Sequence, residues 1–305
     1  MSDTLPIDDP QTDVVFKYKT LRSLIGLIAF AIPWFCIIAI WIAQDGKWLL
    51  PTSISVSYHL GAGDVFVGML AIVGAFLFAY NGHKYPHFKL FGKPRKVERL
   101  MAVLAGICAL GVALSPTSID KAWMDELATR GYILTDFPGM SLDDIDTNRL
   151  GNCDEIEKDD NNETGKSERK CTLSTYPITP TIHMFCAITL FFVLIGFCLN
   201  FIIRTCKKLE KLADRTGTEA EMTRNRIRWR RRLYWFSAVL ILLSGALAIA
   251  AAFGAFGESV KDYAVMIAEF GCLKGFAISW FVSGSGVLRG NDAEEVDVTV
   301  NLDKE

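Results

Sequence analysis

The residues best suited to chemistry in this chain lie beside strongly apolar segments. The stretch 53–64 contains Ser57, His59 and Asp64, and a second histidine, His183, begins another apolar run. Two histidines with a carboxylate could hold Zn²⁺ and leave room for a water molecule. A metal-bound water is acidic enough to lose a proton and could attack an ester or amide in a lipid head group.

The elements that must position these residues are predicted to be membrane-spanning helices. Of 305 residues, 51% are hydrophobic and the mean hydropathy is +0.27, which is more apolar than expected for a soluble protein of this size. A helix needs roughly 20 apolar residues to cross a bilayer core. Six runs approach this length, so we expect an all-α protein with six transmembrane helices, at about 21–44, 64–81, 99–115, 181–203, 233–256 and 263–283.

Lysine and arginine are concentrated in segments that predict the orientation of these helices. They precede the first run and fill the connections 83–98 and 204–232. Because short basic loops stay in the cytoplasm, both termini are predicted to be cytoplasmic. The connections 45–63, 116–180 and 257–262 then lie outside. The expected parts are a tail (1–20), a membrane domain (21–288) and a disordered acidic tail (289–305).

This topology places His59, Asp64, His183 and Glu258 at a similar depth near the outer leaflet. Together with Ser57 they are the candidates for a polar ligand pocket, and the first three are the candidates for a metal site. No HExxH-type spacing supports zinc, so no cofactor is firmly expected. Asp64 also has a structural explanation, because negative charge is favourable at the start of a helix.

Two charged residues, Glu269 and Lys274, fall inside the last apolar run. Charges within a bilayer are costly unless they are paired or hydrated, which makes each a functional candidate. Residues five apart do not share a helix face, so each needs a partner on another helix or in a hydrated cavity. The alternatives are a buried structural ion pair and a polar pathway for a proton or an anion.

The connection 116–180 is long and acidic, and it contains Cys153 and Cys171. These are the cysteines suited to a disulfide, since an extracytoplasmic face permits oxidation. The acidic residues could bind Ca²⁺, but the loop has no EF-hand pattern, and a solvated loop is the simpler interpretation.

Lipids are the expected partners, and no nucleic-acid partner is expected. Lys and Arg in the 204–232 connection predict contact with anionic lipid, or a site for a specific head group. Gly271, Gly275 and Ser279 form a stripe of small residues that lets another helix approach closely. The stripe fits packing within one bundle, and a homo-oligomer through it is the alternative.

Three segments resemble, as a set, uncharacterised six-helix bacterial membrane proteins classed as domains of unknown function. They are Ser53-Ile-Ser with Asp64-Val-Phe-Val-Gly68, 107–117 (ICALGVALSPT) and 278–284 (ISWFVSG). The resemblance implies the bacterial inner membrane and carries no activity. A fainter similarity is to alkaline ceramidase-type hydrolases, which imply a serine, an aspartate and three histidines around zinc in seven helices. This chain has two outward histidines and six helices.

The sequence thus favours a non-enzymatic membrane protein that binds, senses or passes a lipid or small solute through a polar pocket near the outer leaflet. One alternative is a metal-dependent lipid hydrolase that uses the same pocket. The other is a proton-coupled transporter that uses Glu269 and Lys274.

Overall fold

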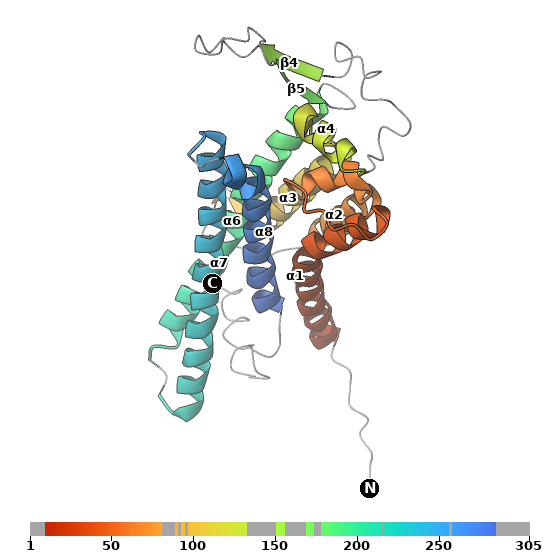
Figure 1. Cartoon of the computed structure of the whole chain (residues 1–305). Helices are drawn as coiled ribbons and strands as arrows, with labels where there is room; N and C mark the ends of the chain where they lie inside the picture. Colours follow the sequence, from red (N-terminus) through yellow and green to blue (C-terminus); the bar gives the residue numbers. More distant parts are fainter. Residues whose placement is uncertain are drawn as a thin grey trace.

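A computed structural model describes residues 10–80, 89–90, 93–94, 97–132, 151–155, 169–173, 178–214, 216–255 and 258–284 of the chain. Within these described residues, six long helices form the body of the structure (Figure 1). They are α1 (Pro10–Ala43), α2 (Gly63–Ala79), α3 (Val97–Leu114), α6 (Thr179–Lys211), α7 (Thr218–Ala252) and α8 (Glu258–Gly284).

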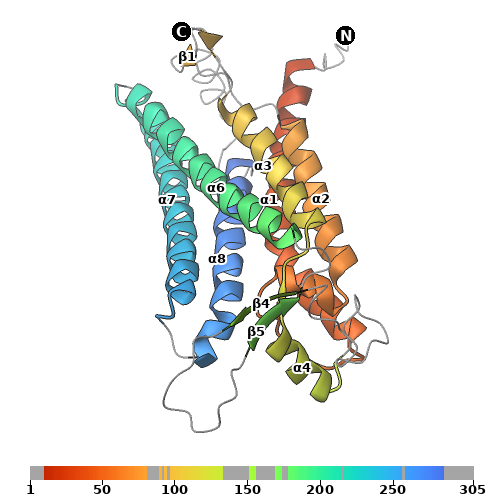
Figure 2. The same ribbon diagram turned by 90° about the horizontal axis from the view of Figure 1, so that it is seen from above.

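The six helices close into a ring in which each packs on its neighbour in the chain. α1 contacts α2, α2 contacts α3, and the order continues through α6 and α7 to α8, which returns to α1. Figure 2 shows the start of α1 and the start of α3 at one end of the bundle. α4 (Lys121–Thr129) lies at the other end with the strands β4 (Gly151–Glu155) and β5 (Arg169–Leu173). The predicted all-helical membrane bundle is therefore present.

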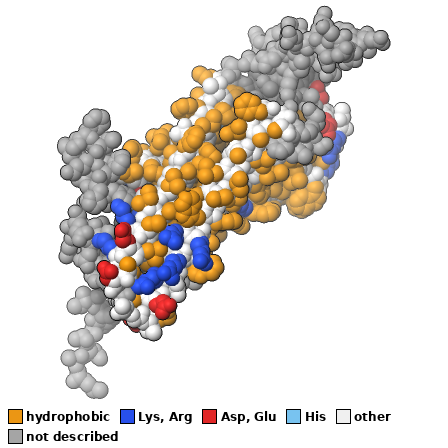
Figure 3. Space-filling model, turned by 90° about the vertical axis from the view of Figure 1, so that its left-hand side faces the viewer, with side chains coloured by type: hydrophobic (Ala, Val, Ile, Leu, Met, Phe, Trp, Pro, Cys, Tyr) orange, Lys and Arg blue, Asp and Glu red, His pale blue; other side chains and the backbone are white. Residues whose placement is uncertain are grey.

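Five of the described helices are long and apolar enough to cross a membrane, which indicates a multi-pass membrane protein. The remaining long helix, α2, is apolar but only 17 residues long. Large apolar side chains cover the outside of the bundle, as Figure 3 shows for the flank that it presents. A surface that faces lipid needs no polar residues. A membrane protein is therefore expected to carry hydrophobic side chains on its outer surface as well as in its core.

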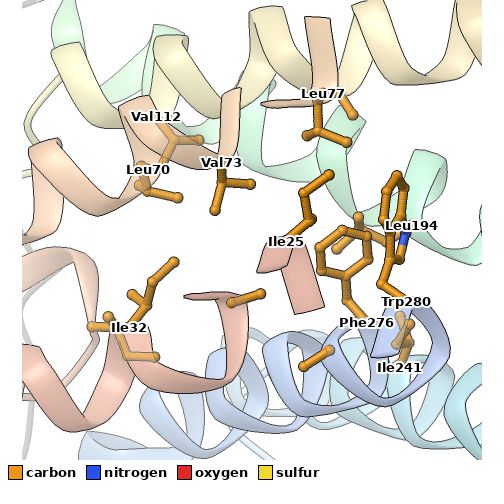
Figure 4. Packing of buried hydrophobic residues seen from close by; sticks show 14 of the residues in the cluster. Ile25, Ile32, Leu70, Val73, Leu77, Val112, Leu194, Ile241, Phe276 and Trp280 are labelled. Atoms are coloured by element: carbon orange, nitrogen blue, oxygen red, sulfur yellow. The ribbon is translucent and has the colours of Figure 1, made fainter. Parts of the chain in front are cut away.

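The core of the bundle is a continuous apolar cluster to which all six long helices contribute. Figure 4 shows Ile25 of α1 near Leu77 of α2, with Phe276 and Trp280 of α8 beside them. Trp280 is fully buried, and its ring lies 5.0 Å from that of Tyr80 and 5.2 Å from that of Phe197. Aromatic packing at such distances adds to the burial energy and fixes the relative positions of the helices.

The sequence analysis predicted an outer loop at 45–63. In the structure this segment is not a plain loop. It folds back against the bundle and includes a buried 3₁₀-helix, η1 (Ser55–Leu60). Gln44 donates to the carbonyl of Leu60 at 3.2 Å, and the carbonyl of Thr52 accepts from the backbone N–H of Met266 in α8 at 3.1 Å. Backbone that is not helical needs such partners when it is buried in a membrane protein.

The stripe of small residues on α8 packs within the chain. A Cβ atom on Gly275 would lie 2.7 Å from Ile241 and 2.9 Å from the carbonyl of Ser237, both in α7, and a Cβ on Gly271 would collide with Ser244. Ser279 is fully buried. α7 thus occupies the face that a homo-oligomer through this stripe would need.

The connection 116–180 contains short strands that the sequence analysis did not predict. β3 (Ile119–Asp120) and β4 (Gly151–Glu155) flank β5 (Arg169–Leu173) in an antiparallel sheet. Cys153 lies directly opposite Cys171 in this sheet. Opposite Cα atoms of antiparallel strands are about 4.5 or 5.5 Å apart, within the range that a disulfide spans. The side chains lie outside the described residues, so the disulfide stays a prediction.

The predicted basic connection 204–232 is largely helical. α6 continues to Lys211 and α7 begins at Thr218, so the two helices extend past the apolar runs. A second short hairpin, β1 (Lys89–Leu90) with β2 (Lys93–Pro94), lies in the other basic connection. The acidic tail 289–305 and residues 1–9 lie outside the described residues.

Candidate functional site

A chain of hydrogen bonds joins α8, the buried segment and α6 inside the bundle. Ser55 Oγ donates to Glu269 Oε1 at 3.2 Å, and the backbone N–H of Ile54 donates to Glu269 Oε2. On its other side Ser55 Oγ lies 3.0 Å from His183 Nε2. His183 Nδ1 lies 2.7 Å from the carbonyl oxygen of Ser115, at the end of α3. We call Ser55, His183 and Glu269 the Ser55 cluster.

The positions of the protons in the Ser55 cluster follow from its acceptors. The carbonyl of Ser115 can only accept, so His183 Nδ1 must carry a proton. Ser55 has a single hydroxyl proton to share between Glu269 and His183 Nε2. Either Ser55 donates to a carboxylate and accepts from an imidazolium, or it donates to a neutral imidazole and accepts from a protonated carboxyl group.

These two arrangements contain the same number of protons. They differ by the movement of one proton from His183 to Ser55 and of another from Ser55 to Glu269. Ser55 and His183 are each 6% exposed, so the exchange would occur inside the protein. The geometry allows a proton to pass between the imidazole and the carboxyl group in two short steps through the Ser55 hydroxyl.

Two further candidates from the sequence, Ser57 and His59, lie in the same buried segment. His59 is fully buried, and its Nε2 donates to the carbonyl of Thr117 at 2.8 Å. Ser57 is also fully buried and donates to the carbonyl of Ile54. His59 lies close enough to His183 for the two rings to interact electrostatically. The structure thus brings Ser57, His59 and His183 into one region.

Asp64 lies apart from these contacts. It is exposed in the first turn of α2, and its side chain does not cap the helix. Its negative charge still suits that position, because backbone N–H groups point toward it. Glu258 begins α8, but its side chain lies outside the described residues.

The predicted zinc ligands do not come together. Among the residues that the structure describes, no three His, Cys, Asp or Glu side chains could hold one metal ion. Both ring nitrogens of His183 already meet protein oxygens, and His59 Nε2 donates to a carbonyl, whereas a ligand nitrogen must present a lone pair. These side chains do not fit the zinc site that the sequence suggested.

Lys274 faces a different neighbour from Glu269, as their spacing predicted. Its Nζ donates to the carbonyl of Phe30 in α1 at 2.5 Å and lies 3.4 Å from the centre of the Phe30 ring. Trp34 and Phe270 lie at 5.2 and 5.5 Å. Cation–π contacts and a carbonyl can compensate a cation near lipid. Among the described residues, the contacts of Lys274 include no carboxylate, so they differ from the buried structural ion pair that was one of the two alternatives.

A second polar cluster at the other end of the bundle was missed in the sequence analysis. Glu98, at the start of α3, is fully buried and accepts from Arg204 at 2.7 Å and from Asn200 at 2.9 Å. Tyr80 donates to its other oxygen at 3.1 Å, and Arg22 lies 3.9 Å from it. We call these residues the Glu98 network.

The Glu98 network connects helices that are distant in the chain. Arg22 in α1 donates to Ser283 in α8 at 2.9 Å and to the Tyr80 hydroxyl at the end of α2. One signal in the sequence was an acid beside a strongly basic connection. Glu98 is the last residue of the connection 83–98, and the basic residues there and in 204–232 were used only to predict the orientation of the helices.

Comparisons with known proteins identify no relative of this chain. No family model, no curated protein and no solved structure matches the chain significantly. Function is therefore inferred from the chain's own geometry.

Proposed function

We propose that this chain is a proton-translocating membrane transporter, with Glu269, Ser55 and His183 as its proton-transfer groups. The observation that carries the proposal is the continuous chain of hydrogen bonds from Glu269 through Ser55 Oγ to His183. Ionisable residues inside transporters commonly form proton relays. This develops the transporter alternative, with His183 in the place that the sequence analysis gave to Lys274.

The surroundings of the Ser55 cluster support proton transfer over ligand binding. Each polar atom of the cluster meets another protein group, and Ile54 supplies a backbone N–H that stabilises the carboxylate form of Glu269. The proton can therefore move without rearrangement of the backbone. We also propose that the chain spans the membrane with six helices, has cytoplasmic termini and lies in a bacterial inner membrane. The basic connections support this orientation. Labelling of single introduced cysteines from each side would test the orientation.

Proton flux into liposomes containing the purified protein tests this function. With a pH-sensitive dye inside and an imposed proton gradient, the wild type is expected to acidify the interior faster than protein-free liposomes. Glu269→Gln and Ser55→Ala are expected to slow this flux about tenfold or more, because each removes a proton-transfer group. Infrared spectra recorded across a pH step should show a carboxylic acid band that Glu269→Gln lacks.

Lys274→Met is the matched control on the same helix. Its Nζ contacts α1 and lies outside the Ser55 cluster, so full flux is expected once the variant folds. The proposal would be wrong if the wild type gave the same flux as protein-free liposomes. It would also be wrong if both Glu269→Gln and Ser55→Ala left the flux unchanged.

A second candidate, a serine hydrolase, is favoured by one distance. Ser55 Oγ lies 3.0 Å from His183 Nε2, and the Ser115 carbonyl orients the ring, which is the arrangement of nucleophile, base and orienting group. Two features oppose it. Ser55 is only 6% exposed, which keeps a substrate away from its hydroxyl. The nearby N–H of Ile54 already donates to Glu269, so it does not serve as a donor to the oxyanion that forms in a hydrolase. We expect no labelling of Ser55 by a fluorophosphonate probe; stoichiometric labelling would favour the hydrolase.

A further inference from the structure

Two cysteine thiols meet at the interface between α3 and α6. Cys108 belongs to α3 and Cys186 to α6, and their side chains are close enough for a hydrogen bond between the thiols. Both cysteines are free. A Cβ atom on Gly111, one turn after Cys108, would collide with the sulfur of Cys186 and lie 3.2 Å from its Cβ. The missing side chain at Gly111 therefore lets the sulfur of Cys186 lie directly against α3.

The two thiols lie one helical turn from the contact between His183 and the carbonyl of Ser115. Cys186 comes one turn after His183 in α6, and Gly111 comes one turn before Ser115 in α3. The thiols and the Ser55 cluster thus share one contact between two helices. In the proposed orientation this is the extracytoplasmic half of the bundle, and disulfides persist on that side of a membrane.

Access differs between the two thiols. Cys108 is 3% exposed, whereas Cys186 is partly exposed. A small uncharged oxidant that enters the bilayer would therefore meet Cys186 first. Cys108 is then in place to react with the oxidised sulfur.

We propose that Cys108 and Cys186 form a reversible disulfide that joins α3 to α6 in the presence of a peroxide. In the first step the Cys186 thiol takes one oxygen atom from hydrogen peroxide, the O–O bond breaks, and a sulfenic acid and one water molecule result. In the second step the Cys108 sulfur attacks the Cys186 sulfur, and the S–O bond breaks. The hydroxyl group leaves with the Cys108 proton as a second water molecule.

This sequence oxidises two thiols and reduces one peroxide molecule to two water molecules. A soluble dithiol restores both thiols by thiol–disulfide exchange. The disulfide would close a loop that contains the whole connection 116–180. Closing a long loop lowers the entropy of the unfolded chain, so the oxidised protein is expected to resist unfolding more than the reduced protein. The inference goes beyond the proposed transport function and does not depend on it.

Mass spectrometry of the full chain in nanodiscs tests the disulfide. The protein is treated with hydrogen peroxide, its remaining thiols are alkylated, and the digest is analysed for linked peptides. We expect a peptide pair joined through Cys108 and Cys186 that disappears after dithiothreitol. Cys206 is exposed on the same helix as Cys186, so its oxidation reports that the peroxide has reached the protein.

Single variants test the order of the two steps. In Cys108→Ala the sulfenic acid on Cys186 has no thiol to condense with, so dimedone, which labels sulfenic acids, is expected to label Cys186. In Cys186→Ala the buried Cys108 is expected to remain unlabelled. Cys198→Ala is the matched control, because Cys198 is a fully buried cysteine of α6 outside the pair.

Thermal unfolding tests the link between the helices. Peroxide is expected to raise the unfolding temperature of the wild type and of Cys198→Ala, and dithiothreitol should reverse the rise. Cys108→Ala should show no rise, although it retains Cys153 and Cys171.

Three outcomes would overturn the inference. The first is a wild type in which Cys206 is oxidised and no peptide joins Cys108 to Cys186. The second is an equal rise in unfolding temperature in the wild type and in Cys108→Ala, which would assign the stabilisation to other cysteines. The third is dimedone on Cys108 in Cys186→Ala, which contradicts the assigned order. The wild-type digest does not depend on the variants, so the inference can still fail if a variant does not fold.

Discussion

Replacing Glu98 with alanine is expected to lower the free energy of unfolding by about 3–5 kcal/mol, a large part of the total stability of most proteins. The carboxylate of Glu98 is fully buried and contacts Arg22, Tyr80, Asn200 and Arg204, which belong to three different segments. Without it, two arginine charges remain in the bundle without this counter-ion. Removing one partner of a buried pair leaves the other charge without its counter-ion, which is costly inside a protein.

Glu98→Gln should lie between alanine and the wild type. Its amide oxygen can still accept hydrogen bonds from Arg204 or Tyr80, but the negative charge is gone. The measurement is the fraction of monodisperse protein that survives a series of temperatures in one detergent. A Glu98→Ala variant as stable as the wild type would show that the network contributes little to folding.

Glu126→Gln on α4 is the control for this comparison. Glu126 pairs with Arg130 one turn later at 3.3 Å, but its side chain is 60% exposed. Exposed pairs contribute about 0–1 kcal/mol, so little change is expected. The contrast between Glu98 and Glu126 therefore isolates the effect of burial on the same type of side chain.

The second large effect is expected from a single methyl group, in Gly26→Ala. A Cβ atom on Gly26 would lie 2.8 Å from the backbone nitrogen of Phe281 and 2.9 Å from the carbonyl oxygen of Ala277. Backbone atoms cannot rotate away as a side chain can, so α1 and α8 must separate. Overpacking of this kind costs about 1–3 kcal/mol, and that exceeds the helix preference of alanine over glycine, about 1 kcal/mol.

Gly68→Ala in α2 is the matched control, and it should have the opposite sign. Nothing lies within 4 Å of the Cβ position at Gly68, so only the helix preference remains. We expect a gain of up to about 1 kcal/mol, measured in the same unfolding series. Equal destabilisation by both substitutions would mean that the α1–α8 contact is not the cause.

The contact between α8 and α1 also closes the ring of helices. The effect of Gly26→Ala should therefore extend to both polar clusters. Arg22 lies one turn before Gly26 and reaches Ser283 across the same interface. Separation of α1 from α8 should therefore disturb the Glu98 network as well. The Ser55 cluster depends on α8 through Glu269, so loss of proton flux in Gly26→Ala is an expected secondary effect.

The sequence by itself determined the class of protein and the approximate helices. Hydrophobic runs report what each segment can bury or expose to lipid, and this property is local, so each run overlaps one of the six long helices, although α1, α6 and α7 extend beyond their runs. The spacing of Glu269 and Lys274 also predicted that they face different neighbours, because helix geometry alone decides it.

Only the tertiary structure decided which polar residues meet. Ser55 and Glu269 are 214 residues apart, and Arg204 and Glu98 are 106 apart. A topology prediction gives the depth of a side chain but not its lateral position, so Asp64 was grouped with His59 by depth, although Asp64 is exposed and His59 is buried. The basic connections predicted 45–63 to be an outer loop, and no local pattern showed that Ser55, Ser57 and His59 in it would be buried against partners that the fold supplies. Pairing of distant residues depends on how the helices pack, and no local pattern encodes that.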